Sequence, residues 1–136
     1  MGSCFAAFFN KRPILGNGWG SYLDAMTGTT FQGAHNDYFQ FLAETGLIGL
    51  IIHLIAEISC LYYSGKAFNY FKGEQYKGTF EQKWIFISYT FQLFILLYAL
   101  TGMPHYSYEQ YGLYLMLCGF SIGLYKRQKR KHKSIK

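Results

Sequence analysis

The chain has 136 residues, which is enough for one ordinary domain. Apolar residues make up 51% and aromatic residues 21%, and this excludes a disordered chain, which would be poor in aromatics and rich in charge. The net charge of +6 arises in the last eleven residues, which hold seven Lys and Arg; the remainder has six basic and seven acidic residues. The positive charge is therefore a tail rather than a folded basic face, which argues against a nucleic-acid partner.

Residues 1–39 are predicted to form a loop that carries three short motifs. Arg12-Pro13 comes first, and its proline ends any helix that arrives from upstream. The glycines of Gly16-Asn17-Gly18-Trp19-Gly20 permit positive φ values and a close approach of backbone to a ligand. The pair His35-Asn36 lies just before the first apolar stretch.

Three stretches have the length and apolar character of membrane spans: residues 40–63, 84–103 and 106–125. The second holds no formal charge, and twenty helical residues at about 1.5 Å each cover roughly 30 Å, the thickness of bilayer hydrocarbon. The third holds only Glu109, near one end. The fold class expected is all-α, a multi-span membrane helical bundle; a soluble helical domain with buried core helices is the alternative.

Basic residues beside these stretches predict their orientation. The loop between the first two has four Lys, residues 126–136 have seven Lys and Arg, and the turn at 104–105 has none. The basic tail and the lysine loop are therefore expected in the cytoplasm, and the 1–39 loop outside. The prediction is a multi-pass membrane protein with a cytoplasmic C-terminus. We expect the chain to be the C-terminal portion of a longer multi-span protein, or a truncated product.

These three motifs and a fourth, Glu44 to Gly49, together resemble the bacterial O-antigen ligase and O-antigen polymerase family, and the resemblance implies a location in the bacterial inner membrane. That family combines an Arg-Pro and glycine-rich turn with a His-Asn pair and a Glu-x-Gly-x-x-Gly on the next membrane helix. Here these are Arg12-Pro13, Gly16–Gly20, His35-Asn36, and Glu44 to Gly49. The similarity covers about residues 11–55, and the family has about ten to fourteen spans, so most of it is absent from this chain.

The resemblance implies a metal-independent glycosyltransferase without cofactors. Such enzymes move a glycan from an undecaprenyl-pyrophosphate carrier to a lipid or glycan acceptor on the outer side of the membrane. The partners implied are this lipid-linked donor, the acceptor, membrane lipids and the missing N-terminal spans. Two or three helices cannot enclose a long lipid carrier, so we expect no activity from these 136 residues alone.

The residue chemistry is compatible with this reaction. His35 is the candidate general base for the attacking sugar hydroxyl, since histidine takes up protons near neutral pH. Arg12 is the candidate pyrophosphate contact, because a guanidinium binds phosphate oxygens in pairs. The residues expected around the substrate are Lys11, Gly18, Trp19, Asn36, Tyr38 and Glu44. Trp19 and Tyr38 are candidates for stacking on a sugar, and an orienting role is favoured for Glu44.

Each assignment has a structural alternative. His35 could bond a loop carbonyl or cap the helix, with Asn36 or Asp37 as further candidate caps. Arg12 could anchor the chain at the membrane surface, with Lys11 in the same role, and the glycines could serve loop geometry alone.

Two other histidines also have more than one interpretation. His53 and Glu57 share a helical face and could form a proton relay, although mutual bonding of two polar groups is favoured. His105 could line the acceptor entrance or lie in an ordinary surface turn. Four histidines spaced 18, 52 and 27 residues apart predict no metal site. The alternative functions are a non-catalytic membrane remnant and a small transport component.

Overall fold

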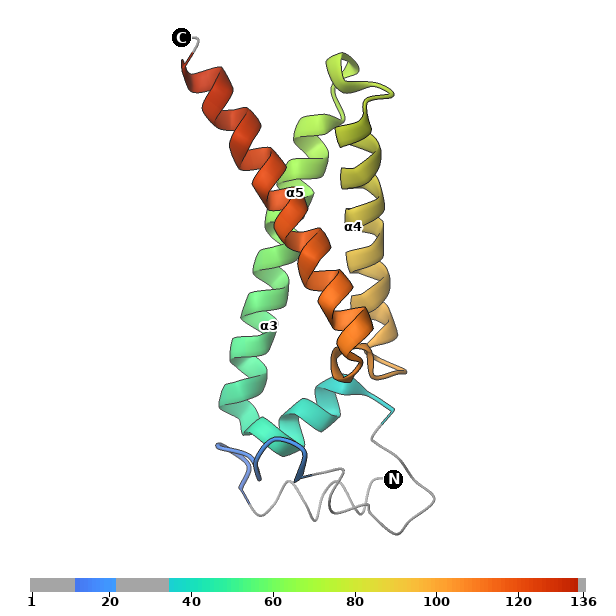
Figure 1. The fold of residues 1–136 in the computed structure, drawn as a ribbon. Helices are drawn as coiled ribbons and strands as arrows, with labels where there is room; N and C mark the ends of the chain where they lie inside the picture. Colours follow the sequence, from blue (N-terminus) through green and yellow to red (C-terminus); the bar gives the residue numbers. More distant parts are fainter. Residues whose placement is uncertain (1–11, 22–34, 135–136) are drawn as a thin grey trace. The chain divides into compact units, whose positions relative to one another are not determined.

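The computed structural model describes residues 12–21 and 35–134, and in these ranges it is helical, with no strand. The elements are α3 (Asp37–Phe71), the 3-10 turn η1 (Glu74–Tyr76), α4 (Phe80–Tyr98), the 3-10 turn η2 (Pro104–Tyr106) and α5 (Tyr108–Ser134) (Figure 1). The all-α class is thus confirmed. Lys11 lies outside the described residues.

The chain divides into two compact units. The described part of the first comprises residues 12–21, 35–56 and 97–107, and that of the second comprises residues 57–96 and 108–134. The first unit contains the motifs, α3 up to residue 56 and the connection between α4 and α5, and the second contains the rest of α3, most of α4, and α5.

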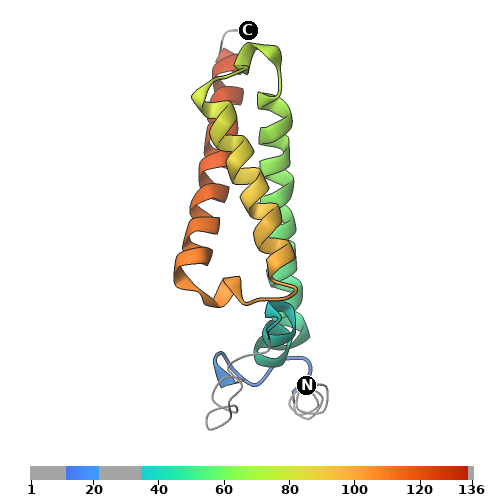
Figure 2. The same cartoon turned by 90° about the vertical axis from the view of Figure 1, so that its right-hand side faces the viewer.

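The first unit is organised around a break in α3. Gly46 has φ 70° and ψ −172°, so the helical backbone stops there and resumes at Leu47. Both views show α3 change direction near its start (Figures 1 and 2). The predicted span at 40–63 lies within α3, but the sequence prediction did not include this break.

The loop that contains the Arg-Pro motif bonds to both sides of the break. On the first side, Gly18 N donates to Glu44 O at 2.9 Å, and Asn17 donates to Ala43 O from its backbone and from Nδ2, at 3.3 and 3.0 Å. Beyond Gly46, Leu47 N donates to Pro13 O at 3.0 Å and Ile48 N donates to Ile14 O at 3.3 Å.

These bonds replace those that a helix loses when it is interrupted. The last carbonyls and first amides of a helical segment lack partners within it, and leaving such groups unbonded away from water costs free energy. Residues 13–18 supply both donors and acceptors, so the loop completes the hydrogen bonding of the broken helix.

The second unit buries a mixed core between its helices. One apolar cluster is formed by Ala67, Phe71 and Ile85, and another by Ile95, Tyr114 and Cys118. Ser88 on α4 links the helices through hydrogen bonds: its hydroxyl donates to Leu117 O at 2.8 Å, and Ser121 Oγ donates to Ser88 Oγ at 2.6 Å. Small serines allow the close approach that these bonds require.

The helix ends differ from the predicted spans. α4 ends at Tyr98 rather than 103, because residues 99–103 form a turn in which Gly102 N donates back to Tyr98 O at 2.7 Å. α5 continues to Ser134, so the basic tail extends the last helix instead of following it. Helical propensity explains the extension, since Lys and Arg are good helix formers.

One helix in the described ranges, α3, is long and apolar enough to cross a membrane, with a mean hydropathy of 1.8 over its most apolar stretch. The mean hydropathy of α4 and α5 is lower because both helices contain tyrosine, glutamine and serine among their apolar residues. Only 22% of the apolar stretch of α3 is buried in the chain. Large apolar residues on α3 are correspondingly exposed, among them Ile51, Ile52, Ile55 and Ile58.

The break in α3 predicts a specific requirement for glycine. In Gly46→Ala the new Cβ would collide with Ile14 O and Gly16 N, and a non-glycine residue at φ 70° and ψ −172° costs a further ~1–3 kcal/mol. We expect a clearly lower melting temperature, measured by circular dichroism in detergent. Gly119→Ala in α5 is the matched control, since open space surrounds Gly119. Equal melting temperatures for the two variants would contradict the assigned role of Gly46.

Candidate functional site

The start of α3 carries the His-Asn motif. His35 has φ 49°, a left-handed conformation that is uncommon for residues other than glycine, and its side chain is exposed. Asn36 caps α3, because its Oδ1 accepts from Phe39 N at 3.0 Å. Asn36 Nδ2 also donates to Leu100 O at 2.8 Å, which ties the helix start to the turn that follows α4. Of the alternative caps, Asn36 is thus the one observed, and its contact with substrate stays a prediction.

Asp37 is fully buried and binds His105. Its Oδ2 accepts from His105 N at 2.9 Å and lies 2.7 Å from His105 Nδ1. The side chain of His105 is only 1% exposed, so the interpretation of this segment as an ordinary surface turn is wrong. The reason is tertiary: η2 packs its histidine against the carboxylate at the start of α3.

Glu44 is a second buried carboxylate of the first unit. Gln40 Nε2 donates to Glu44 Oε1 at 3.2 Å, and the Tyr106 hydroxyl donates to Glu44 Oε2 at 2.8 Å. Burial first, and then this hydrogen bond, raises the pKa of the Tyr106 hydroxyl well above its ordinary value. Tyr106 therefore remains a proton donor throughout the physiological range. Both oxygens of Glu44 are engaged, which suits the orienting role predicted for it.

Aromatic rings connect the glycine loop to Tyr106, the residue that bonds to Glu44. Trp19 stacks on Tyr106 with ring centroids 5.2 Å apart and an interplanar angle of 12°. The edge contact of Trp19 with Phe41 has a centroid separation of 5.3 Å. Trp19 nevertheless remains 65% exposed, so part of its side chain is open to solvent. Tyr38, the other predicted stacking residue, is half-buried in the first turn of α3.

The glycine loop uses its amides within the chain. Gly16, Gly18 and Gly20 all have positive φ, at 72°, 103° and 79°. The amide of Gly16 donates to Arg12 O at 2.8 Å, and the next two amides donate to the end of the first segment of α3. The backbone amides of residues 16–18 thus donate hydrogen bonds within the chain. This favours a role in loop geometry over phosphate binding by these three amides.

The remaining predicted residues lie at the surface. Arg12 is exposed at the start of the loop, and His35 is exposed at the start of α3. The structure brings Gly18, Trp19 and Glu44 together, whereas neither Arg12 nor His35 belongs to the buried polar cluster around them. We define this buried polar cluster by its members: Asp37, Gln40, Glu44, His105 and Tyr106.

Sequence analysis named Asp37, Glu44 and His105 separately, but it did not predict that they meet, and it gave no role to Gln40 or Tyr106. Asp37, Gln40 and Glu44 are spaced i, i+3 and i+7, which places them on one helical face. A polar stripe at the start of an apolar helix was therefore a readable signal. The η2 residues gave no such signal, because His105 and Tyr106 are more than sixty residues away in sequence and join the cluster only through folding.

The hydrogen bond from Tyr106 to Glu44 should contribute measurably to the free energy of unfolding. Tyr106→Phe leaves a buried carboxylate oxygen without its donor, and we expect a loss of roughly 1–3 kcal/mol in unfolding free energy. Tyr108→Phe is the control, since Tyr108 is 97% exposed.

The pH dependence of this difference follows from the raised Tyr106 pKa. A group with a raised folded-state pKa contributes stability below its unfolded pKa and loses it as the pH rises toward the folded value. The difference between wild type and Tyr106→Phe should therefore be flat from about pH 6 to 9 and shrink above about pH 10. Denaturant titration in detergent measures it, and a difference that vanished below pH 9 would contradict the assignment.

No known protein guides the interpretation of this site. No family model, curated protein or solved structure matches the chain. The functional argument therefore depends on the residues and on the geometry described above.

Proposed function

We propose that this chain is the motif-bearing part of a bacterial membrane glycosyltransferase of the O-antigen ligase or polymerase type. It transfers or polymerises a glycan carried on undecaprenyl pyrophosphate. One observation carries the proposal: the Arg-Pro and glycine loop is hydrogen-bonded into the break of α3, beside the Glu44 of the Glu-x-Gly-x-x-Gly motif. Three of the four sequence motifs that suggested the family thus form one structural element in the first unit.

The membrane setting of the proposal is supported by exposure and charge. α3 is apolar and mostly exposed along its most apolar stretch, as expected for a helix covered by lipid or by other membrane helices. We propose that α4 and α5 are further spans, with the basic end of α5 in the cytoplasm and the first unit at the outer surface. Further helices, N-terminal to this chain, would complete the groove for the lipid carrier.

The proposed chemistry divides between the two exposed motif residues. His35 takes the proton of an acceptor hydroxyl while the oxygen of that hydroxyl bonds to the anomeric carbon of the donor sugar. The bond from that carbon to the pyrophosphate oxygen breaks at the same time, and undecaprenyl pyrophosphate leaves with the electron pair. Arg12 stabilises the charge that develops on this leaving group. The left-handed backbone of His35 supports the assignment, since such geometry is concentrated at functional positions.

The binding residues have matching roles in this proposal. The exposed part of Trp19 offers a stacking face for a sugar, with Tyr38 as a second candidate. Glu44 accepts a hydrogen bond from Tyr106, and the Tyr106 ring stacks on Trp19 and fixes its position. Asn36 fixes the helix start that carries His35, and Lys11 adds positive charge next to Arg12 in the sequence.

Surface glycan tests the catalytic assignment. In a host strain that carries the parent gene as its single copy, His35→Ala and Arg12→Ala should each reduce glycan transfer by about 10²-fold or more, because they remove the base or a charge partner. The glycan is resolved on gels, and membrane protein levels are compared by blot.

Matched controls and alternative outcomes sharpen this experiment. His132→Ala and Arg127→Ala remove a histidine and an arginine on the opposite, cytoplasmic side and should leave the glycan unchanged. Loss of long chains with single units still attached indicates a polymerase, and loss of all attachment indicates a ligase. Unchanged glycan in His35→Ala at normal protein level refutes the general-base role.

Cysteine labelling tests the proposed topology. In a cysteine-free background, Tyr108→Cys should react with an impermeant maleimide added to intact spheroplasts, whereas Glu74→Cys should react only after lysis. Both positions are well exposed, so the difference reports the side of the membrane. Equal labelling of the two positions before lysis would contradict the proposed arrangement of spans.

A further inference from the structure

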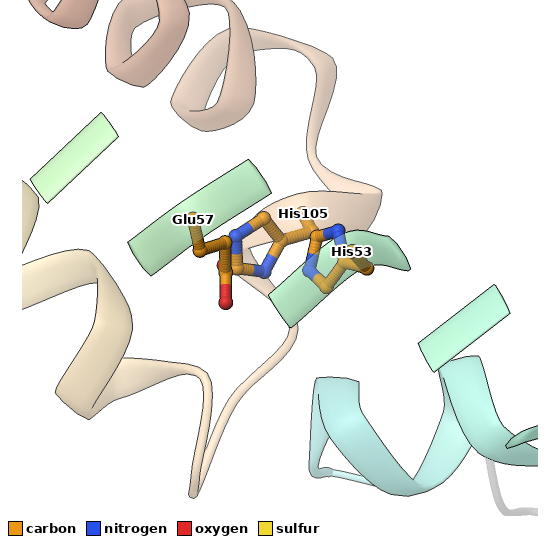
Figure 3. A group of neighbouring side chains, drawn as sticks. All are labelled: His53, Glu57 and His105. Atoms are coloured by element: carbon orange, nitrogen blue, oxygen red, sulfur yellow. The ribbon is translucent and has the colours of Figure 1, made fainter. Parts of the chain in front are cut away.

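Two histidines that lie far apart in sequence meet in the first unit. His53 is on α3 and His105 is in η2, and their rings form an edge contact with centroids 5.0 Å apart at 88°. A ligating nitrogen of each lies within 4.8 Å of the other, close enough for one ion to be shared after a small adjustment. Figure 3 shows the two imidazoles side by side.

Both rings are held in place by other contacts. His53 stacks on Phe41 with a centroid separation of 4.1 Å and an interplanar angle of 12°. The Nδ1 of His105 is bonded to Asp37 Oδ2 at 2.7 Å, with the backbone amide of His105 on the same oxygen. A carboxylate on Nδ1 places the proton there and directs the lone pair to Nε2, as in metal sites where a carboxylate orients a ligating histidine.

We propose that His53 and His105 bind one divalent transition-metal ion, with Asp37 as the residue that orients His105. Imidazole nitrogens are ligands that zinc uses, and the positions that remain open on the ion can take water or a phosphate oxygen. Nitrogen donors favour Zn²⁺ over Mg²⁺ or Ca²⁺, which prefer oxygen ligands. The inference is independent of the proposed glycosyl transfer, because it uses neither His35 nor Arg12.

The proposal explains why the sequence predicted no metal site. His53 and His105 are 52 residues apart and lie on different elements, so no spacing motif connects them. Only the packing of η2 against α3 within the first unit brings their nitrogens together.

Zinc binding by the tag-free 136-residue chain in detergent is the first test. The protein is stripped with a chelator, equilibrated with Zn²⁺ and analysed for bound metal, and its affinity is measured by competition with a chromogenic chelator. We expect about one Zn²⁺ per chain. His53→Ala and His105→Ala should each weaken binding by at least about tenfold, and Asp37→Asn by about 10–100-fold.

The controls separate a defined site from general histidine binding. His35→Ala and His132→Ala remove one histidine each and should retain wild-type zinc affinity. If the double variant His53→Ala/His105→Ala still bound Zn²⁺ as tightly as the wild type, the proposed site would be refuted.

A second measurement does not depend on how well the variants fold. Wild-type protein loaded with Co²⁺ should show the intense visible absorption of four-coordinate cobalt, and added Zn²⁺ should remove it. The melting temperature of the wild type should also rise with Zn²⁺, because a ligand that binds only the folded state stabilises it. A wild-type protein with no cobalt spectrum and no zinc-dependent shift would overturn the proposal.

Discussion

The backbone of α3 breaks at Gly46, and the groups left open by the break bond to residues 13–18. Each unbonded amide or carbonyl costs roughly several kcal/mol in an apolar environment. A broken apolar helix therefore needs hydrogen-bond partners at the break. The loop supplies these partners on both sides. Gly16 and Gly46 are then constrained together, because a Cβ on either would collide with the backbone of the other segment.

The position of this loop determines the rest of the first unit. With residues 13–18 fixed against α3, Trp19 stacks on Tyr106, and Tyr106 donates to Glu44. The same η2 turn directs His105 to Asp37 at the start of α3. Two buried carboxylates thus hold the connection between α4 and α5, and each does so with a directional bond to an adjacent residue of η2.

The proposed transfer site and the proposed metal site use different parts of this unit. The transfer site consists of exposed residues, since a lipid-linked donor and an acceptor must reach His35 and Arg12. The metal site uses ligands that are half-buried or buried, among them His105 with its orienting carboxylate. The two proposals are therefore separable by experiment: glycan transfer can fail while zinc binding persists, and zinc binding can fail while the His35 assignment stands.

Local sequence determined the parts that depend on composition and on neighbouring residues. Apolar stretches of helical length predicted an all-α chain, and the polar residues before residue 40 allowed for the Asn36 cap. The alternating glycines also indicated positive φ values, which all three adopt. These features follow from side-chain hydrophobicity and from the steric freedom of single residues.

Only the tertiary structure decided which distant groups meet. The break at Gly46 depends on hydrogen bonds from a loop about thirty residues earlier, and the burial of His105 depends on Asp37, 68 residues away. The pairing of His53 with His105 likewise has no local cause. Hydrogen bonds and ring contacts act over a few ångströms in space whatever the separation in sequence, so the pattern along the chain does not contain them.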